Sequence, residues 1–223
     1  MVSASASGKP LAMTEAEVAD IVERDLLRTF PKHPFLSVAN ERLIPALRRV
    51  LLAFAAYHPH IGYCQSLNFL AALLLLHGDE AGAFALLATL CESLVLEFHT
   101  PDLRGLHQTQ ASLLDALARH MPALSGKLTR DGVPVREQTT HWLLCLFVDA
   151  LPMELVLRLW DLLFFEGQQV ISHACVALFY LHETQLLAAE ELYSIKPILK
   201  GNDADVLVRT VVELLESSEA ELS

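Results

Sequence analysis

Apolar residues recur at three- and four-residue spacing along most of the chain, which is the pattern of helices with one buried face. The first predicted helix begins at the capping-box sequence Thr14–Glu17 and ends before Pro31. Its apolar stripe consists of Val18, Ile21, Val22 and Leu26. Similar patterns predict helices at about 41–57, 63–76, 80–98, 105–120, 138–149, 153–165, 169–183 and 204–217. Alternation typical of strands and fixed-period repeats are both missing, so we predict an all-α fold, a single multi-helix bundle.

The predicted bundle occupies residues 14–217, between a flexible leader at 1–13 and an acidic tail at 218–223. The long apolar runs Phe69–Leu76 and Trp142–Val148 are much shorter than the roughly 20 residues that a membrane span needs. The leader lacks the basic and apolar regions of a signal peptide, and the four cysteines are too far apart for a dense disulfide framework. We therefore expect a cytoplasmic protein with no integral membrane segment.

Composition and charge narrow the function classes. The 223 residues include 16 Lys+Arg and 27 Asp+Glu, for a formal net charge of −11. This balance excludes a sequence-independent nucleic-acid binder, which would need clustered basic residues to neutralise phosphates. The mean hydropathy of +0.38 also excludes a disordered chain. The acidity is uneven, because residues 1–60 hold 7 basic and 6 acidic groups and the remaining chain holds 9 and 21.

Two polar groups are candidates for chemistry. Asp25 and Arg28 lie three residues apart on the first predicted helix, close enough to pair across one turn. The heptapeptide 62–68, GYCQSLN, opens a helix that is otherwise very apolar, and a helix N-terminus suits contact with phosphate or with another protein. Each group also has a structural alternative. The first could be a surface ion pair, and Tyr63, Gln65 and Asn68 could merely satisfy buried backbone groups.

Other reactive residues do not form a recognisable site. Cys64 with His58 or His60 as a base lacks an orienting residue and an oxyanion hole. His58, His60 and His33 are best explained as chance neighbours, so we expect no metal site. A Gly-rich phosphate loop with Lys-Ser/Thr is missing, so the chain is not expected to bind nucleotide by itself.

Aromatic residues in the second half of the sequence follow helical spacing and are expected in the core. They are Trp142, Phe147, Trp160, Phe164 and Phe165. Asp161 follows Trp160 in the same apolar segment. We expect its carboxylate to be at least half-buried and bonded to a neighbouring helix end, because an unpaired buried carboxylate is costly.

Taken together, the motifs resemble those of TBC-domain Rab GTPase-activating proteins. Ile21, Asp25 and Arg28 resemble the family's IxxDxxR motif, with one residue more between Ile21 and Asp25 than the motif has, and Tyr63-Cys64-Gln65 matches its YxQ motif. The later landmarks of the family follow in the same order: Trp142 with Phe147, Leu151-Pro152, Leu159-Trp160-Asp161 and Glu166-Gly167. The resemblance covers roughly residues 15–200.

Two departures from the family pattern concern the start of the domain and the second motif. The family's Arg-x-x-Trp segment should precede the first helix, and this chain lacks it, so we expect a TBC-type bundle that is short at its N-terminus. The family's Gly-Met after the motif glutamine is Ser66-Leu67 here. We expect both replacements to be compatible with a helix and to affect fine geometry and partner choice.

The resemblance implies two catalytic fingers supplied to a partner. Arg28 would neutralise the charge that develops on the transferring phosphoryl group of a GTP-bound Rab, and Gln65 would orient the attacking water. Residues that would support the fingers or bind the partner are Ile21, Asp25, Tyr63 and Asn68. The chain would need no cofactor, because the partner GTPase would carry GTP and Mg²⁺. It would therefore be an activator in trans, rather than an enzyme with its own substrate pocket.

Two other interpretations remain at this stage. A TBC-like module could bind a GTPase or scaffold without accelerating hydrolysis, and an unrelated helical adaptor would make the ordered motifs a coincidence. If the chain is an activator, Arg28 and Gln65 must project from one exposed face. That face should be the less negative one, because Arg28, Arg42, Arg48 and Arg49 all lie in the near-neutral first 60 residues.

Overall fold

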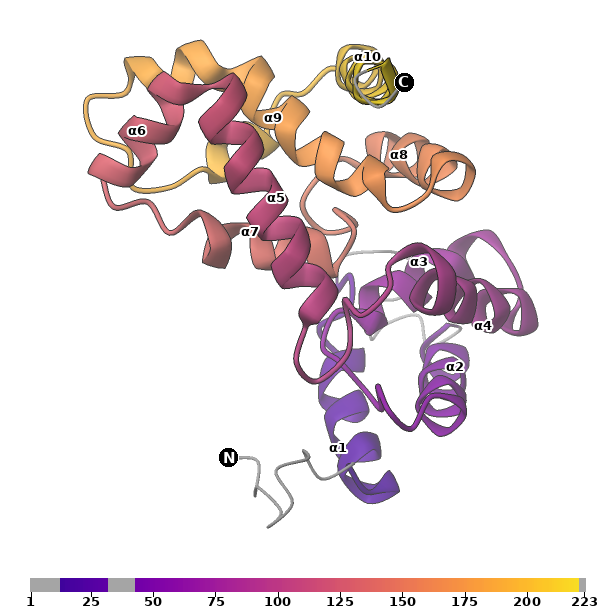
Figure 1. The fold of residues 1–223 in the computed structure, drawn as a ribbon. Helices are drawn as coiled ribbons and strands as arrows, with labels where there is room; N and C mark the ends of the chain where they lie inside the picture. Colours follow the sequence, from indigo (N-terminus) through magenta and orange to yellow (C-terminus); the bar gives the residue numbers. More distant parts are fainter. Residues whose placement is uncertain (1–12, 32–42, 221–223) are drawn as a thin grey trace. The chain divides into compact units, whose positions relative to one another are not determined.

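The computed structural model describes residues 13–31 and 43–220. These residues form helices and turns without any β-strand, which confirms the all-α prediction (Figure 1). The chain divides into two compact units, Met1–Arg104 and Gly105–Ser223. The leader at 1–13 lies outside the described residues except for Met13, and the domain boundaries at 14 and 217 stay predictions.

The first unit is built around α2. Its elements are α1 (Glu15–Leu26), α2 (Ile44–Tyr57), α3 (Leu67–His77), α4 (Glu80–Thr89) and a π-helical turn, η1 (Leu90–Leu94). Helix α2 packs against α1, α3 and α4, and α3 also packs against α1. Most of α3 is buried, including every residue from Leu70 to Leu75, as expected for a helix that is apolar on all sides.

Helix α1 forms where the local sequence signals place it. The Thr14 hydroxyl accepts a hydrogen bond from the Glu17 backbone N–H at 3.3 Å, and the Glu17 carboxylate accepts one from the Thr14 N–H at 2.8 Å. This is the predicted capping box. Val18, Val22 and Leu26 are buried, so the predicted stripe faces the interior of the first unit.

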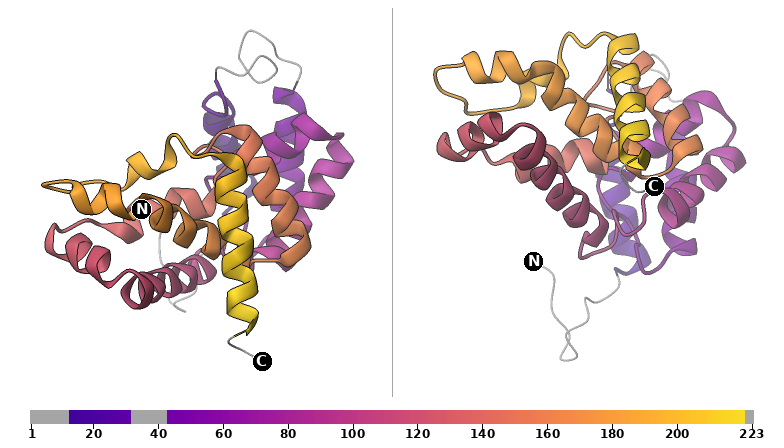
Figure 2. Two further views of the ribbon diagram at one scale, coloured as in Figure 1. Left: turned by 90° about the horizontal axis from the view of Figure 1, so that it is seen from above. Right: turned by 45° about the horizontal axis from the view of Figure 1, so that its top comes forward.

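The second unit surrounds α9. Its elements are α5 (Arg104–His120), which begins at the unit boundary, α6 (Pro122–Arg130), α7 (Val135–Leu144), α8 (Met153–Glu166), α9 (Gln169–Ala188), a short 3₁₀ helix, η2 (Lys196–Leu199), and α10 (Ala204–Ala220). Helix α9 packs against α6, α8 and α10, and Figure 2 shows α10 beside α8 and α9.

Several predicted boundaries are wrong where the backbone turns without an obvious sequence signal. The helix predicted for 138–149 ends at Leu144, because Leu146 and Phe147 adopt positive φ angles of 45° and 65°. The helix predicted for 80–98 changes from α to π geometry after Thr89. Helix α6 was not predicted; it begins at Pro122, since proline is well tolerated in the first helical turn. Residues 41 and 42, where the second helix was predicted to begin, lie outside the described residues.

Helix α8 corrects the prediction for its aromatic and acidic residues. Trp160 is buried and donates its indole N–H to the Leu146 carbonyl at 3.1 Å, as an aromatic core residue should. Phe164 and Phe165 are 39% and 84% exposed, and Asp161 is exposed as well. The core-facing stripe is Leu155, Val156, Leu159, Trp160 and Leu163. Asp161 and Phe165 are four residues apart, so they share the opposite face of the helix.

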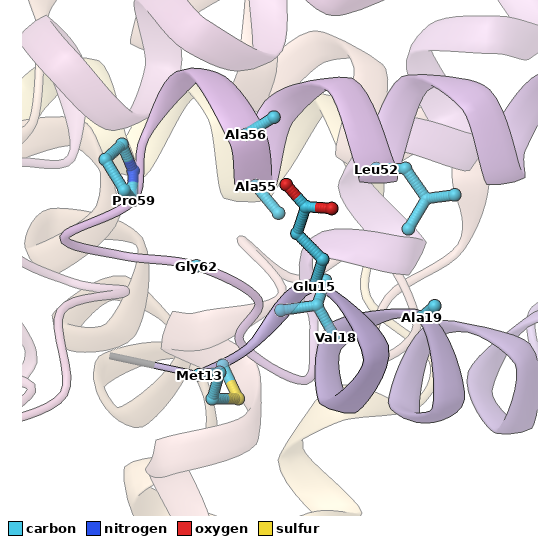
Figure 3. Close-up of a pocket in the computed structure, with 9 residues that line it drawn as sticks. All are labelled: Met13, Glu15, Val18, Ala19, Leu52, Ala55, Ala56, Pro59 and Gly62. Atoms are coloured by element: carbon cyan, nitrogen blue, oxygen red, sulfur yellow. The ribbon is translucent and has the colours of Figure 1, made fainter. Parts of the chain in front are cut away.

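A largely apolar pocket of about 550 Å³ lies between the start of α1 and the end of α2. Figure 3 shows the Glu15 side chain reaching from α1 toward Ala55 and Ala56 of α2. None of the six candidate site residues lines this pocket. Among the described residues, every helix is too short or too polar to cross a membrane.

Candidate functional site

The end of α1 carries a buried carboxylate next to an exposed guanidinium. Asp25 is 2% exposed, whereas the Arg28 side chain is 52% exposed. Arg28 Nη2 lies 2.5 Å from Asp25 Oδ1. Because one partner is buried, this pair differs from the surface ion pair that spacing alone allowed. The carboxylate therefore holds the guanidinium of Arg28, the far end of its side chain, just beyond the end of α1.

The segment that carries Gln65 is a turn before α3 and not its first helical turn. Helix α3 begins at Leu67, so Tyr63, Cys64 and Gln65 lie outside it, contrary to the prediction. Gly62 enters the turn with a φ of +63°, and a Cβ there would lie 3.1 Å from Met13 Cε. Ser66, the residue before α3, has a φ of 118°. Ser66 is therefore not helical, contrary to the expectation that it is compatible with a helix, and its positive φ is a conformation that favours glycine.

Tyr63 forms the first tether between this turn and α1. Its hydroxyl donates to Asp25 Oδ2 at 2.6 Å, and both side chains are buried. Burial and the adjacent carboxylate raise the pKa of Tyr63 well above its usual range. The phenol therefore stays protonated and able to donate. One carboxylate thus holds Arg28 with one oxygen and Tyr63 with the other.

Asn68 forms the second tether. It is fully buried, and its side-chain amide donates to Thr29 Oγ1 at 2.8 Å. Its side-chain carbonyl accepts the Ser66 backbone N–H at 3.1 Å. The Thr29 hydroxyl in turn donates to the Asp25 backbone carbonyl at 2.7 Å. The amide of Asn68 therefore connects the residue after Arg28 to the residue after Gln65.

An aromatic contact adds to these hydrogen bonds. The rings of Phe30 and Phe69 meet edge to face, with their centroids 5.3 Å apart. Gln65 is exposed, and Ile21 is half-buried on α1. Arg28 and Gln65 are thus the exposed members of two segments that are held together by Asp25–Tyr63 and Thr29–Asn68, which we call the two tethers.

Two other arginines of the first unit, Arg48 and Arg49, are engaged by acidic residues. The Arg49 guanidinium forms two hydrogen bonds with Glu80, at 2.5 and 2.8 Å, and Arg48 pairs in the same way with Glu23. These contacts lower the pKa of Glu23 and of Glu80. Arg48 and Arg49 therefore add little unbalanced positive charge. Arg42 lies outside the described residues, so the expectation of a less negative finger face stays a prediction.

Cys64 is not poised as a nucleophile. Burial raises its pKa to about 11, so the thiol is protonated at neutral pH. The histidines that the sequence offered as metal ligands form no ligand group among the described residues, and His33 lies outside them. A different trio in the second unit, His141, Cys145 and Asp149, brings potential ligand atoms within 4.8 Å of one another.

Sequence reasoning missed Thr29 and the conformation of Ser66. A threonine directly after a helix-ending arginine is a weak signal, although threonine hydroxyls commonly bond to the carbonyl four residues earlier. For Ser66, the signal was the replacement of a glycine, since glycines in turns are often required by positive φ.

Comparisons with known proteins agree with the fold and the motifs. The model of the family described as Rab-GTPase-TBC domain matches residues 5–187. Growth hormone-regulated TBC protein 1 of Xenopus laevis is 36% identical over 191 residues, which are 83% of this chain and 56% of that protein. Small G protein signaling modulator 3 of Homo sapiens is 32% identical over 209 residues, which are 91% of this chain and 28% of that protein. The chain thus spans about half or less of the length of these relatives.

Solved structures give the same answer. The flagellar RabGAP TBC domain of Chlamydomonas superposes with a TM-score of 0.76 at 28% identity, covering 88% of this chain and 68% of that one. The Ypt/Rab-GAP domain of Gyp1p superposes with a TM-score of 0.82 at 18% identity, covering 95% and 76%, and this likeness concerns the fold alone. Helical architecture, ordered motifs and a match over most of the chain lead to one conclusion: the chain belongs to the Rab-GTPase-TBC domain family.

Proposed function

We propose that this chain accelerates GTP hydrolysis by a GTP-bound Rab-type GTPase, with Arg28 and Gln65 supplied as fingers in trans. The observation that supports the proposal is the pair of tethers. The tethers join the two segments that carry the exposed side chains, the guanidinium of Arg28 and the amide of Gln65, and the tether residues themselves are buried. Preorganised groups of this kind cost little reorganisation when the reaction occurs.

Arg28 suits the stabilisation of a transferring phosphoryl group. A guanidinium is planar, permanently charged and rich in donors, so it can neutralise charge on several oxygens at once. Arginine fingers contribute about 10³–10⁵ in rate, or roughly 4–7 kcal/mol. Asp25 holds the guanidinium through Nη2, and half of the Arg28 side chain remains exposed for a partner.

Gln65 suits the orientation of the attacking water. Its amide can accept a hydrogen bond from the water with its oxygen and donate to a phosphate oxygen with its nitrogen. The two tethers restrain the turn on either side of it, because Tyr63 precedes Gln65 and Ser66 follows it. Ile21 would contact the partner beside the fingers.

The same proposal accounts for the location of the chemistry. The fingers lie on exposed surface, and the large pocket between α1 and α2 contains neither of them. GTP and Mg²⁺ would come with the partner, so the chain requires no cofactor. It would act in the cytoplasm, at vesicles or other membranes that carry its Rab.

One observation favours the second candidate, a module that binds a GTPase without accelerating hydrolysis. Ser66 adopts a φ of 118° directly after Gln65, where glycine would be unstrained. Strain at this residue could be relieved by a shift of the turn, which would move the Gln65 amide away from the water while Arg28 and the binding surface stay in place.

Single-turnover GTP hydrolysis by a panel of Rab proteins separates the two candidates. Arg28→Ala should reduce the acceleration about 10³-fold or more, and Gln65→Ala should also abolish most of it, with helicity unchanged. Arg24→Ala is the matched control, because Arg24 is exposed on the same helix and pairs with Asp20. Binding of GTP-loaded Rab with hydrolysis at its intrinsic rate would establish the binding module instead.

A further inference from the structure

The trio His141, Cys145 and Asp149 lies where α7 ends, in the second unit. Cys145 Sγ is 3.6 Å from His141 Nδ1 and 3.9 Å from Nε2, and His141 Nε2 is in contact with Asp149 Oδ2. All three residues offer ligand atoms within 4.8 Å of one another. The side chains of His141 and Asp149 are 51% and 21% exposed, whereas Cys145 is buried. The trio therefore has an inner thiol and an outer opening to solvent.

A compact turn brings these residues together. His141 and Cys145 are one helical turn apart, and the Cys145 N–H donates to the His141 carbonyl at 3.0 Å. Leu146 and Phe147 then reverse the chain with positive φ angles, and the Phe147 N–H donates back to the Trp142 carbonyl at 2.8 Å. Without this reversal, a continued helix would carry Asp149 a further turn beyond Cys145 and away from His141.

The chemistry of the trio fits a borderline transition metal. Imidazole nitrogen, thiolate sulfur and carboxylate oxygen are the three ligand types of Zn²⁺, at about 2.0–2.3 Å from the ion. A tetrahedral ion with those bond lengths separates sulfur from nitrogen by about 3.6 Å, close to the observed spacings. A thiolate and a carboxylate together also balance the charge of a divalent cation.

We propose that His141, Cys145 and Asp149 bind Zn²⁺ or a similar divalent transition metal, with a fourth position open to solvent. Of the two imidazole nitrogens, Nε2 is the ligand, because it contacts Asp149 Oδ2 and also lies within 3.9 Å of Cys145 Sγ. Binding replaces the hydrogen bond between Nε2 and Asp149 by one bond from each of them to the ion. The proton of that hydrogen bond leaves, and the imidazole stays neutral with its remaining proton on Nδ1. The Cys145 thiol loses its proton to solvent as the metal–sulfur bond forms.

The same three residue types also occur in nucleophilic triads, but the surroundings argue against one here. Cys145 is 0% exposed, so its sulfur is not accessible to a substrate carbonyl. A metal ion is small enough to enter between the two exposed ligands. Its effect would be structural, because it would join the end of α7 to the turn that leads into α8.

Metal titration of the whole chain tests the proposal. After treatment with EDTA, one equivalent of Co²⁺ should give the intense visible bands of tetrahedral cobalt and a near-ultraviolet thiolate charge-transfer band. Zn²⁺ should displace the cobalt and raise the Tm by roughly 5–10 °C at free metal one hundred times Kd. Cys145→Ser should abolish the charge-transfer band, and Asp149→Asn should weaken binding at least tenfold.

Cys175→Ser is the matched control, because Cys175 is an equally buried thiol of the same unit and belongs to no ligand group. It should leave cobalt binding unchanged. Cobalt spectra that are weak and octahedral, or that are the same in Cys145→Ser and the parent chain, would overturn the proposal. Circular dichroism in EDTA shows that each variant is folded, and Asp149→Asn provides a second test at a partly exposed position if Cys145→Ser does not fold.

Discussion

The tether from Tyr63 to Asp25 makes a quantitative prediction for Tyr63→Phe. The substitution keeps the buried ring and removes only the hydroxyl that donates to Asp25 Oδ2 at 2.6 Å. A hydrogen bond to a charged group contributes about 1.5–3 kcal/mol, and here its loss leaves a buried carboxylate oxygen without that donor. We therefore expect the free energy of unfolding of the first unit to fall by about 2 kcal/mol, which is roughly a 30-fold change in its unfolding equilibrium.

The assay must report the first unit separately. Both tryptophans, Trp142 and Trp160, belong to the second unit, so intrinsic fluorescence during urea denaturation would follow the wrong part of the chain. Amide hydrogen exchange of the peptides that contain α1 and the start of α3 measures the relevant opening. In those peptides, protection should fall about 30-fold in Tyr63→Phe, with no change in α8 and α9.

Tyr57→Phe is the control, because the Tyr57 side chain is 61% exposed and its ring contacts do not involve the hydroxyl. If the two variants differ by less than about 0.5 kcal/mol, the tether does not stabilise the turn and the reasoning is wrong. On the proposed function, Tyr63→Phe should also lower the GTPase acceleration by about 10- to 100-fold, because small displacements of a positioned group are costly.

Three further predictions concern other positions. Ser66→Gly should stabilise the first unit by about 1 kcal/mol in urea denaturation, because relief of a positive φ outweighs the added chain entropy. Phe165→Ser should change stability by less than about 0.5 kcal/mol, whereas Leu163→Ala should cost about 2–5 kcal/mol in the same assay. In EDTA, Asp149→Asn should be less stable than the parent below pH 6.5, since Asp149 raises the pKa of His141 and so favours the protonated folded state. This difference in stability should shrink as the pH rises through the pKa of His141 in the folded state. A difference that grows with pH in thermal melts would contradict the effect of Asp149 on the pKa of His141.

The predictable parts of the fold are those where local signals agree. Helix α1 has a capping box, an apolar stripe and a terminating proline within 18 residues, and the structure places it within a few residues of the prediction. The end of α7 was not predictable in this way. Leu146 and Phe147 carry ordinary helix-compatible side chains, and their positive φ angles follow from contacts such as the Trp160 indole bond to the Leu146 carbonyl.

The candidate site was also predictable only in part. Its residue types could be found in the sequence because they form short motifs on one helix and on one turn. Their contacts could not, since Tyr63 is 38 residues from Asp25 and Asn68 is 39 from Thr29. A local pattern has no information about which of many polar partners a side chain reaches across such a loop.

Burial nevertheless restricts the choice. Asn68 is the one polar residue in the run from Leu67 to Leu76, so a buried α3 forces its amide to find partners or to cost several kcal/mol. Asp25 makes the same demand on the inner face of α1, where its carboxylate must meet a donor. The turn before α3 supplies the Tyr63 hydroxyl as a donor to Asp25, and the end of α1 supplies Thr29 Oγ1 as an acceptor for Asn68. These two contacts satisfy both buried groups. The tethers that join the segments of Arg28 and Gln65 are thus a consequence of satisfying two buried polar groups.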